Sequence, residues 1–263
     1  MLRYILITIS AIVAMHCNAQ DTLVLKEIKN ISCFSVDAKG NMFVADNAFT
    51  LFKYDITGKL ITNVNIKSYG ELTSIDCTNP FEIYAFYQDQ NIIVFYDNML
   101  NVRGELRLND YFLNNVSCVS RSFDNNIWLL DLSQYKLLKI NKKGETIASS
   151  AFLNNVLGEK LNTYKIWEED NSVYVADSAI GVFVFDIYAT YTSTFYIMGT
   201  NGVTSNKKSL LFNQNGKFVR YDKLFREPIK TGLTLPTSTS LDLRLKNVLY
   251  YDGNKIISYP TEY

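Results

Sequence analysis

The chain has 263 residues, and its 26 basic and 26 acidic side chains leave no net formal charge. Its lysines form short turn pairs, such as Lys142-Lys143 and Lys207-Lys208. That pattern argues against binding nucleic acid or an anionic membrane through a basic stripe. Tyrosine (18) and phenylalanine (16) are abundant and proline (4) is scarce, as expected for a chain that is mostly β-strand.

The first residues are typical of a secretory signal. Arg3 is followed by an apolar run from Tyr4 to Met15, and Cys17-Asn18-Ala19 forms a small-residue cleavage site before Gln20. The run is shorter than the ~20 residues that a membrane-spanning helix needs. We therefore expect residues 1–19 to be removed, leaving residues 20–263 as a single domain. A retained membrane anchor is the alternative, and His16 before Cys17 argues against a lipoprotein.

Removal of that segment has a chemical consequence. The chain has one histidine, His16, so the mature protein would have none. Ser-His-Asp and Cys-His catalysis and histidine metal ligation are then excluded. Cys33, Cys77 and Cys118 are odd in number and lack a CxxC spacing, so we expect small buried core residues, with a reactive thiol as the alternative.

A repeated phrase predicts the fold. Asn41–Asp46 followed by Thr50–Asp55 is echoed by Ser172–Asp177 followed by Val182–Asp186: an apolar strand ending in Asp, a turn, and a second apolar strand ending in Asp. A strand-built repeat of roughly 40 residues is the signature of a β-propeller.

The phrase can be followed along the chain in six units. The expected second strands are residues 43–46, 84–87, 128–131, 174–177, 210–213 and 249–252, and the expected third strands are residues 51–55, 92–97, 137–141, 182–186, 218–222 and 256–259. Near-continuous apolar runs of this kind are buried on both faces, as in stacked blades. A two-sheet sandwich would show stricter alternation and no fixed period.

The two ends of the chain complement each other. The last unit has three strands, and Asp21–Ile28 is a strand pattern without a unit of its own. We therefore predict an all-β fold: a six-bladed β-propeller of four-stranded blades, its ring closed by the N-terminal strand pairing with the last blade.

The segment Val36–Leu60 resembles an NHL-type propeller repeat, and Glu169–Asp177 repeats part of the pattern. Cys17–Gln20 is similar to the signal ends of Bacteroidota envelope proteins, and Asp21–Leu23 and Asp177–Ala179 are similar to the O-glycosylation motif of that phylum. The resemblance implies a secreted envelope protein. Propellers of this kind serve there as partners in outer-membrane assemblies, including secretion and gliding machinery.

One acidic position recurs at or just after the second strand, at Asp46, Asp89, Asp131, Asp177 and Asp252. An Asp there can accept hydrogen bonds from the backbone N–H groups of the next turn, which gives it a structural role. The alternative is a ring of carboxylates that binds a cation on one face.

The expected inner strands place charges near the axis. They span residues 31–36, 72–77, 116–122, 163–168, 202–206 and 238–243, and they carry Asp76, Glu168, Asn206 and Asp242 together with Arg121 and Lys165. Some propellers that resemble this one are calcium-dependent lactonases or esterases, whose metal needs six or more oxygen ligands. The two cations oppose such a site, so we expect no metal or cofactor. The charges can instead pair around a wet channel.

The sequence therefore favours binding over catalysis. The candidate binding residues are Tyr69, Tyr111, Arg121, Tyr164, Lys165 and Trp167, because aromatic and Arg side chains dominate interaction hot spots. The long joints at residues 109–115 and 153–162 are either functional loops or harmless insertions.

We expect a non-catalytic scaffold in the periplasm or at the outer membrane, with an envelope protein as partner and without a membrane span of its own. A calcium-dependent hydrolase is the alternative, and a glycan-binding module is the third hypothesis.

Overall fold

The computed structural model describes residues 21–23, 25, 28, 30–154, 160–214, 217–234, 241–244, 247–251 and 255–260. The expected signal segment, Asp252 and residues 155–159 of the second long joint lie outside this part of the chain. Within it, no helix has both the length and the apolar character needed to cross a bilayer.

The strands form six four-stranded sheets, each with antiparallel neighbours. In chain order the first three sheets contain β2 (Ile31–Val36), β3 (Met42–Asp46), β4 (Thr50–Tyr54) and β5 (Leu60–Asn65); β6 (Ser74–Asp76), β7 (Ile83–Tyr87), β8 (Ile92–Tyr96) and β9 (Val102–Arg107); and β10 (Val116–Arg121), β11 (Ile127–Asp131), β12 (Lys136–Ile140) and β13 (Thr146–Ser149).

The next two sheets contain β14 (Thr163–Glu169), β15 (Ser172–Asp177), β16 (Gly181–Asp186) and β17 (Tyr191–Tyr196); and β18 (Thr200–Ser205), β19 (Ser209–Gln214), β20 (Lys217–Asp222) and β21 (Pro228–Thr234). The last sheet has the order β1-β24-β23-β22, from β22 (Leu241–Arg244), β23 (Asn247–Tyr251), β24 (Ile256–Pro260) and β1 (Asp21–Leu23). Two short 3-10 helices, η1 (Lys67–Tyr69) and η2 (Leu108–Tyr111), follow β5 and β9.

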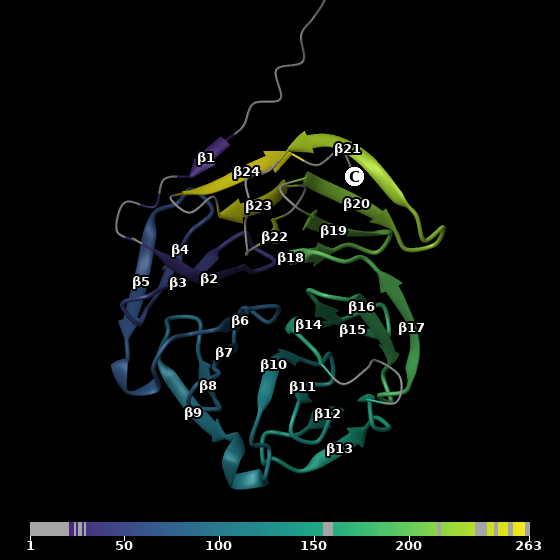
Figure 1. Ribbon diagram of the computed structural model, residues 1–263. Coiled ribbons are helices and arrows are strands. Elements are labelled where there is room, and N and C mark those ends of the chain that lie inside the picture. Colours follow the sequence, from purple (N-terminus) through teal and green to yellow (C-terminus); the bar gives the residue numbers. More distant parts are fainter. Residues whose placement is uncertain are drawn as a thin grey trace, which may run out of the picture.

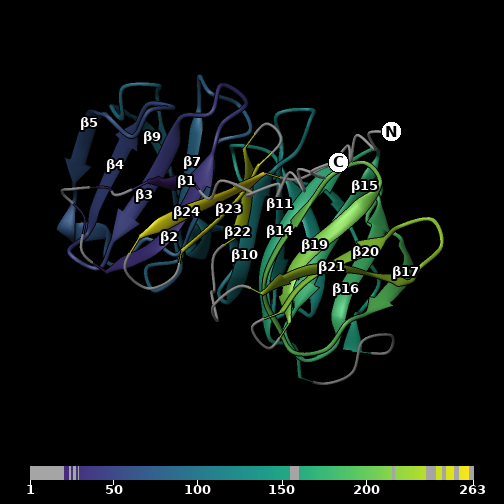
Figure 2. The same ribbon diagram turned by 90° about the horizontal axis from the view of Figure 1, so that it is seen from above.

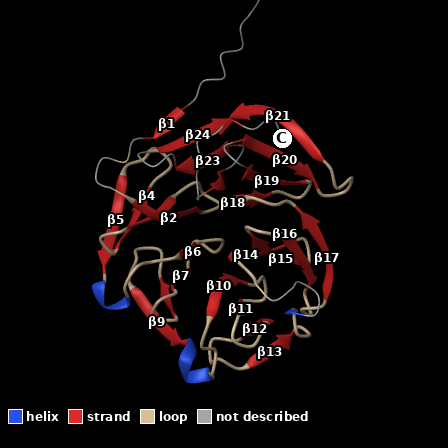
Figure 3. Cartoon of the chain, in the orientation of Figure 1, coloured by secondary structure: helices blue, strands red, loops and turns tan. Residues whose placement is uncertain are grey.

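The sheets are arranged around a common centre, and the strands nearest to it are β2, β6, β10, β14, β18 and β22 (Figure 1). The same orientation coloured by secondary structure shows strands throughout, with the helical turns at the rim (Figure 3). The prediction of an all-β propeller with four-stranded antiparallel blades is confirmed. At the ends of the chain, β1 pairs with β24 through Asp21↔Ser258, Thr22↔Ile257 and Leu23↔Ile256.

The repeated apolar phrase forms the second strand of each sheet. Every residue of β3, β7 and β11 is buried, so these strands have no solvent-exposed face. A single sheet cannot provide such burial, because each of its faces needs a neighbouring sheet. The near-continuous apolar runs in the sequence reflect this packing.

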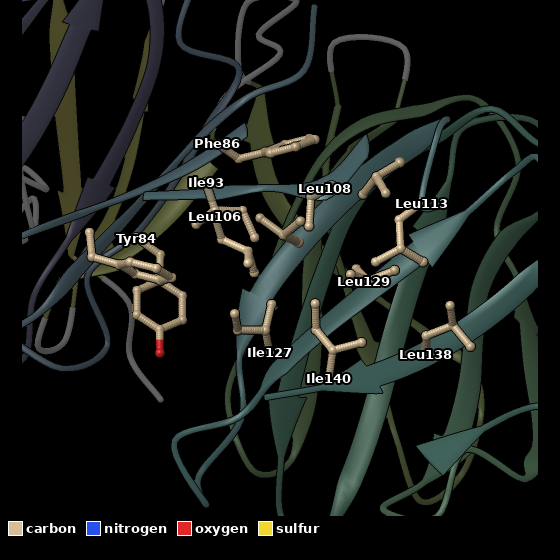
Figure 4. Close-up of a cluster of buried hydrophobic side chains, with 13 residues drawn as sticks. Tyr84, Phe86, Ile93, Leu106, Leu108, Leu113, Ile127, Leu129, Leu138 and Ile140 are labelled. Carbon is tan, nitrogen blue, oxygen red and sulfur yellow. The ribbon is translucent and has the colours of Figure 1, made fainter. Parts of the chain in front are cut away.

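Apolar clusters lie between neighbouring sheets. One combines Tyr84 and Phe86 of β7 with Leu129 of β11 and Leu138 of β12 (Figure 4). Equivalent clusters follow around the molecule, and one contains Met42 and Val44 of the first sheet with Leu249 and Ile256 of the last. Apolar packing therefore also connects the first and last sheets in the chain.

Asp side chains fix the turns, as predicted. Asp46 Oδ1 accepts hydrogen bonds from the backbone N–H groups of Ala48 (3.0 Å) and Thr50 (2.8 Å). Asp131 and Asp177 accept equivalent bonds at the ends of β11 and β15, whereas Asp89 is exposed in its turn. The recurrence of Asp therefore follows from turn geometry, which an acceptor side chain stabilises.

The turns after the third strands use the same device. Asp97 accepts from the N–H groups of Met99 (2.8 Å) and Asn101 (2.9 Å), and Asn141 accepts from those of Lys143 (2.8 Å) and Glu145 (3.0 Å). The hydrogen bond from the Asn101 backbone lowers the pKa of Asp97 to about 2. The Asn141 turn has the same backbone contacts with an amide as the acceptor, and Asn141 Nδ2 also donates to Glu145 Oε2 at 2.6 Å.

We predict that Asp97→Asn weakens the dependence of stability on acid pH. Because the pKa of Asp97 is lower in the folded than in the unfolded protein, its stabilisation is fully present above about pH 4 and is lost as the pH falls towards 2. Asp97→Asn should therefore lose less stability than wild type between pH 5 and pH 3, because an amide oxygen accepts the same hydrogen bonds without titrating. Urea unfolding midpoints at the two pH values test this, and equal pH dependence in both proteins would contradict it.

Candidate functional site

The inner strands surround a central channel with a volume of about 350 Å³. All six innermost strands contribute to its wall, including Ser35 of β2, Asp76 of β6, Val119 of β10, Lys165 of β14 and Asp242 of β22. Thr204 of β18 also lines the channel. The channel is therefore built by every sheet. Of the residues predicted to face the axis, Asp76, Lys165, Glu168 and Asp242 line it, whereas Arg121 and Asn206 do not.

Two channel carboxylates hold neighbouring sheets together. Asp242 Oδ2 accepts hydrogen bonds from Ser35 Oγ (3.0 Å) and from the backbone N–H of Val36 (2.8 Å). Asp76 Oδ2 accepts from the backbone N–H of Arg121 at 2.7 Å, while Oδ1 accepts from Thr78. Each carboxylate thus bonds to the inner strand of a neighbouring sheet.

The end of β14 carries two more such acceptors. Glu168 Oε2 accepts from Ser122 Oγ (2.5 Å) and from the Trp128 indole N–H (2.6 Å). Glu169 Oε2 accepts from Ser205 Oγ and from Lys223 Nζ, both at 2.6 Å. Sequence reasoning chose Glu168 but missed Glu169, although the consecutive acids at 168–170 were a visible signal.

The cations do not pair with these channel acids. Arg121 forms an ion pair with Glu82 at 2.9 Å and lies over the ring of Tyr84, 5.3 Å from its centroid. Lys165 Nζ donates to the backbone carbonyl of Val203 at 2.9 Å. The expected mutual pairing of the axial charges is therefore not formed: Arg121 pairs with Glu82 and Lys165 bonds to backbone, while Glu169 pairs with Lys223.

Three of the six candidate binding residues lie together on β14 and line the channel. They are Tyr164, Lys165 and Trp167. The Tyr164 hydroxyl is 3.1 Å from Thr200 Oγ1, and burial raises its pKa to about 12. Trp167 stacks on Tyr174 with centroids 5.1 Å apart, and its buried indole N–H has no hydrogen-bond acceptor in the described structure.

The other candidates lie elsewhere. Tyr69 is in η1 at the rim, where its hydroxyl donates to Glu105 at 2.9 Å. Tyr111 is in η2, and its ring covers Gly144 so closely that a Cβ added there would clash with the ring. Arg121 lies at the end of β10, beneath the turn to β11. The structure therefore brings three of the six candidates together and separates the others.

The first long joint is tied to the core. Leu108 and Leu113 are buried between the sheets of β6–β9 and β10–β13, and Asn91 Nδ2 donates to Asn109 Oδ1 at 2.6 Å. Phe112, in contrast, is 82% exposed. Leu113 therefore anchors this joint at the sheet boundary, while the other residues of 109–115 are exposed.

The cysteines are free thiols in the walls between sheets. Cys77 and Cys118 are buried and Cys33 is partly buried. Burial raises the pKa of the Cys33 and Cys118 thiols to about 12, and that of Cys77 also lies well above its usual value. The thiols are therefore protonated near neutral pH, as expected for core residues rather than nucleophiles.

The fold is shared with solved structures of different activity. No protein-family model and no curated protein matches the chain. Virginiamycin B lyase from Staphylococcus aureus is 14% identical with a TM-score of 0.65, covering 93% of this chain and 89% of the lyase. The β-propeller domain of Cps50 (Swd1) from Myceliophteria thermophila is 9% identical with a TM-score of 0.67, covering 92% and 100%.

The WD40 domain of Neurospora crassa Pan2 is 11% identical with a TM-score of 0.61, covering 85% of this chain and 73% of that one. At these identities the likeness establishes the propeller fold alone.

Removing a channel carboxylate should destabilise the protein. Asp242→Ala leaves Ser35 Oγ and the Val36 N–H without this acceptor, so we expect a loss of about 1–3 kcal/mol in the free energy of unfolding. Asp242→Asn keeps an acceptor and should lose less. Urea unfolding of the three proteins measures this, and an alanine variant as stable as wild type would refute the role given to Asp242.

The thiols should be unreactive until the protein unfolds. At pH 8 we expect no reaction of Cys33, Cys77 or Cys118 with a thiol-specific reagent in native protein, and reaction of all three in denaturant. Mass spectrometry of the labelled peptides separates the sites. Rapid native labelling at any of them would instead indicate an accessible, activated thiol.

Proposed function

We propose that this chain is a non-catalytic β-propeller that binds another protein and acts as a scaffold in a bacterial cell envelope. The observation that carries the proposal is the use of the channel acids: Asp76, Glu168, Glu169 and Asp242 all accept hydrogen bonds from adjacent sheets. The side chains that could serve as catalytic acids or cation ligands are thus part of the framework. What this framework offers a partner is a rigid surface of turns.

In this proposal the six sheets are blades of one ring that β1 closes. The β1–β24 pairing and the apolar cluster shared by the first and last sheets support this arrangement. So does the hydrogen bond from the backbone N–H of Ile31 to the Tyr251 hydroxyl, at 3.3 Å. A closed ring would hold the turns in fixed positions.

The structural neighbours include both an enzyme and proteins of macromolecular complexes. One lyase structure is a histidine-to-alanine variant described as catalytically inactive, with quinupristin. The only histidine here is His16, which precedes the propeller strands. Another neighbour is part of the mitotic checkpoint complex. The lack of a propeller histidine favours a binding role over the lyase's chemistry.

The calcium-dependent hydrolase is the second candidate. Asp76, Glu168 and Asp242 line the channel and would be its ligands. Within the described residues, however, no three His, Cys, Asp or Glu side chains are grouped closely enough to hold a metal ion. The glycan-binding hypothesis has the exposed rings of Phe81 (69%) and Phe123 (75%) in its favour.

The envelope location is an inference from sequence. It rests on the apolar segment Tyr4–Met15, on the cleavage pattern that follows, and on the Bacteroidota-like signal end. Export across the inner membrane would place the propeller in the periplasm or at the outer membrane.

An affinity experiment tests the scaffold proposal. Tagged protein spanning residues 20–263, incubated with envelope extract of its source bacterium, should retain one envelope protein in a fixed stoichiometry by mass spectrometry and light scattering. A tagged unrelated propeller controls for nonspecific retention. Calcium-dependent hydrolysis of lactones or esters by protein that returns alone would overturn the proposal and establish the hydrolase.

A further inference from the structure

One turn departs from the pattern of the others. In four sheets the turn between the third and fourth strands closes by a hydrogen bond from the backbone N–H of residue i to the carbonyl of residue i+4: Asp55 to Lys59, Asp97 to Asn101, Asn141 to Glu145 and Asp186 to Thr190. Between β20 and β21 the bond runs from Asp222 to Glu227. This turn therefore contains one extra residue.

The extra residue changes what the turn presents to solvent. Leu224 is 81% exposed and Phe225 is 72% exposed. Among the described residues they are the only consecutive large apolar side chains that both exceed 70% exposure. The turn extends outward beside β17 in both views of the ribbon (Figures 1 and 2). A pair of apolar side chains on such a projection contributes little to packing within the domain.

The turn is nevertheless well anchored. Asp222 Oδ1 accepts from the backbone N–H groups of Leu224 (2.8 Å) and Phe225 (2.9 Å). Arg226 donates to Ser193 Oγ of β17 at 2.7 Å, and its guanidinium lies 4.9 Å from the centroid of Phe195. These contacts hold Leu224 and Phe225 outward and limit their collapse onto the domain.

Basic side chains surround this tip. The backbone N–H of Lys223 donates to the carbonyl of Lys208 at 2.9 Å, which brings the exposed Lys207-Lys208 turn alongside. Lys223 itself is paired with Glu169 at 2.6 Å. Asp222 accepts hydrogen bonds within the turn and keeps its negative charge. Lys207, Lys208 and Arg226 therefore stand against Asp222 and Glu227, which leaves an excess of one positive charge at the tip.

We propose that the turn at residues 223–227 is a membrane-surface anchor: Leu224 and Phe225 enter the interfacial region of an anionic bilayer, and Lys207, Lys208 and Arg226 meet its headgroups. A convex apolar tip beside cations fits a lipid surface, which needs no matching pocket. In the sequence Lys207-Lys208 is an isolated turn pair. Only the fold brings it next to Leu224-Phe225. The anchor goes beyond the scaffold proposal and is independent of which protein is bound.

Vesicle sedimentation tests the anchor. Protein spanning residues 20–263 should bind vesicles of phosphatidylcholine with phosphatidylglycerol more tightly than phosphatidylcholine alone, with binding weakened by salt. Leu224→Ser/Phe225→Ser should reduce the affinity on the order of a hundredfold. Lys207→Glu/Lys208→Glu should reduce it at least about tenfold on the anionic vesicles.

Phe112→Ser is the matched control, because Phe112 is equally exposed on a different turn. It should bind vesicles as wild type does, and urea unfolding should show that all variants are folded. The anchor is overturned if wild type binds neither kind of vesicle, or if Leu224→Ser/Phe225→Ser binds as tightly as wild type. It is also overturned if a photo-crosslinker at residue 225 labels only protein in envelope membranes. If the protein does not bind vesicles but retains one envelope protein in a fixed stoichiometry, the anchor is refuted and the scaffold proposal is not.

Discussion

Burial of the second strands on both faces is the constraint on which the rest of the structure depends. β3, β7 and β11 expose no residue, so each sheet is stable only between two neighbours. Apolar clusters fill the space between neighbouring sheets. At the polar ends of the inner strands, Asp76, Asp242 and Glu168 accept hydrogen bonds from the adjacent sheet. The channel is thus a by-product of sheets that must stack around an axis.

A second regularity places cations against second-strand aromatics near the sheet boundaries. Lys53 lies 5.3 Å from the Phe43 centroid, and Lys139 lies 5.0 Å from that of Trp128. Lys53 is almost fully buried, and burial lowers its pKa. Its amine is satisfied by the Asn98 carbonyl at 2.9 Å. An aromatic face and a carbonyl therefore stabilise the buried Lys53 ammonium, whereas Lys139 also pairs with Asp124 at 2.6 Å.

The propeller fold could be predicted from the sequence because it depends on patterns that are local in the chain. The apolar phrase and its terminal Asp occur within about ten residues of each other, and the period repeats the information. The predicted inner strand at residues 72–77 is too long: β6 spans only Ser74–Asp76. Leu72 and Cys77 there are buried core residues outside the ladder, which apolar character alone does not distinguish from strand.

The candidate site was harder to predict because its contacts are remote in sequence. Asp242 meets Ser35 from 207 positions away, and Arg121 meets Glu82 from 39. Which acceptor faces which donor depends on the stagger between sheets, which has no local signature. Tyr69 and Tyr111 looked like anchors by residue type, but the fold places them at the rim against Glu105 and Gly144. The extra residue in the turn at 222–227 is present in the sequence, but it can be recognised only by comparison with the four shorter turns of the structure.

The pairing of β1 with β24 has a consequence for how the chain acquires its structure. Leu23 meets Ile256, so the last sheet joins segments more than two hundred residues apart in the chain. Loop-closure entropy makes such a contact costly until the intervening sheets have formed. During synthesis the first segment emerges early and must wait for the last. We therefore expect folding to end with this sheet and its edge to be the final one exposed to misassociation.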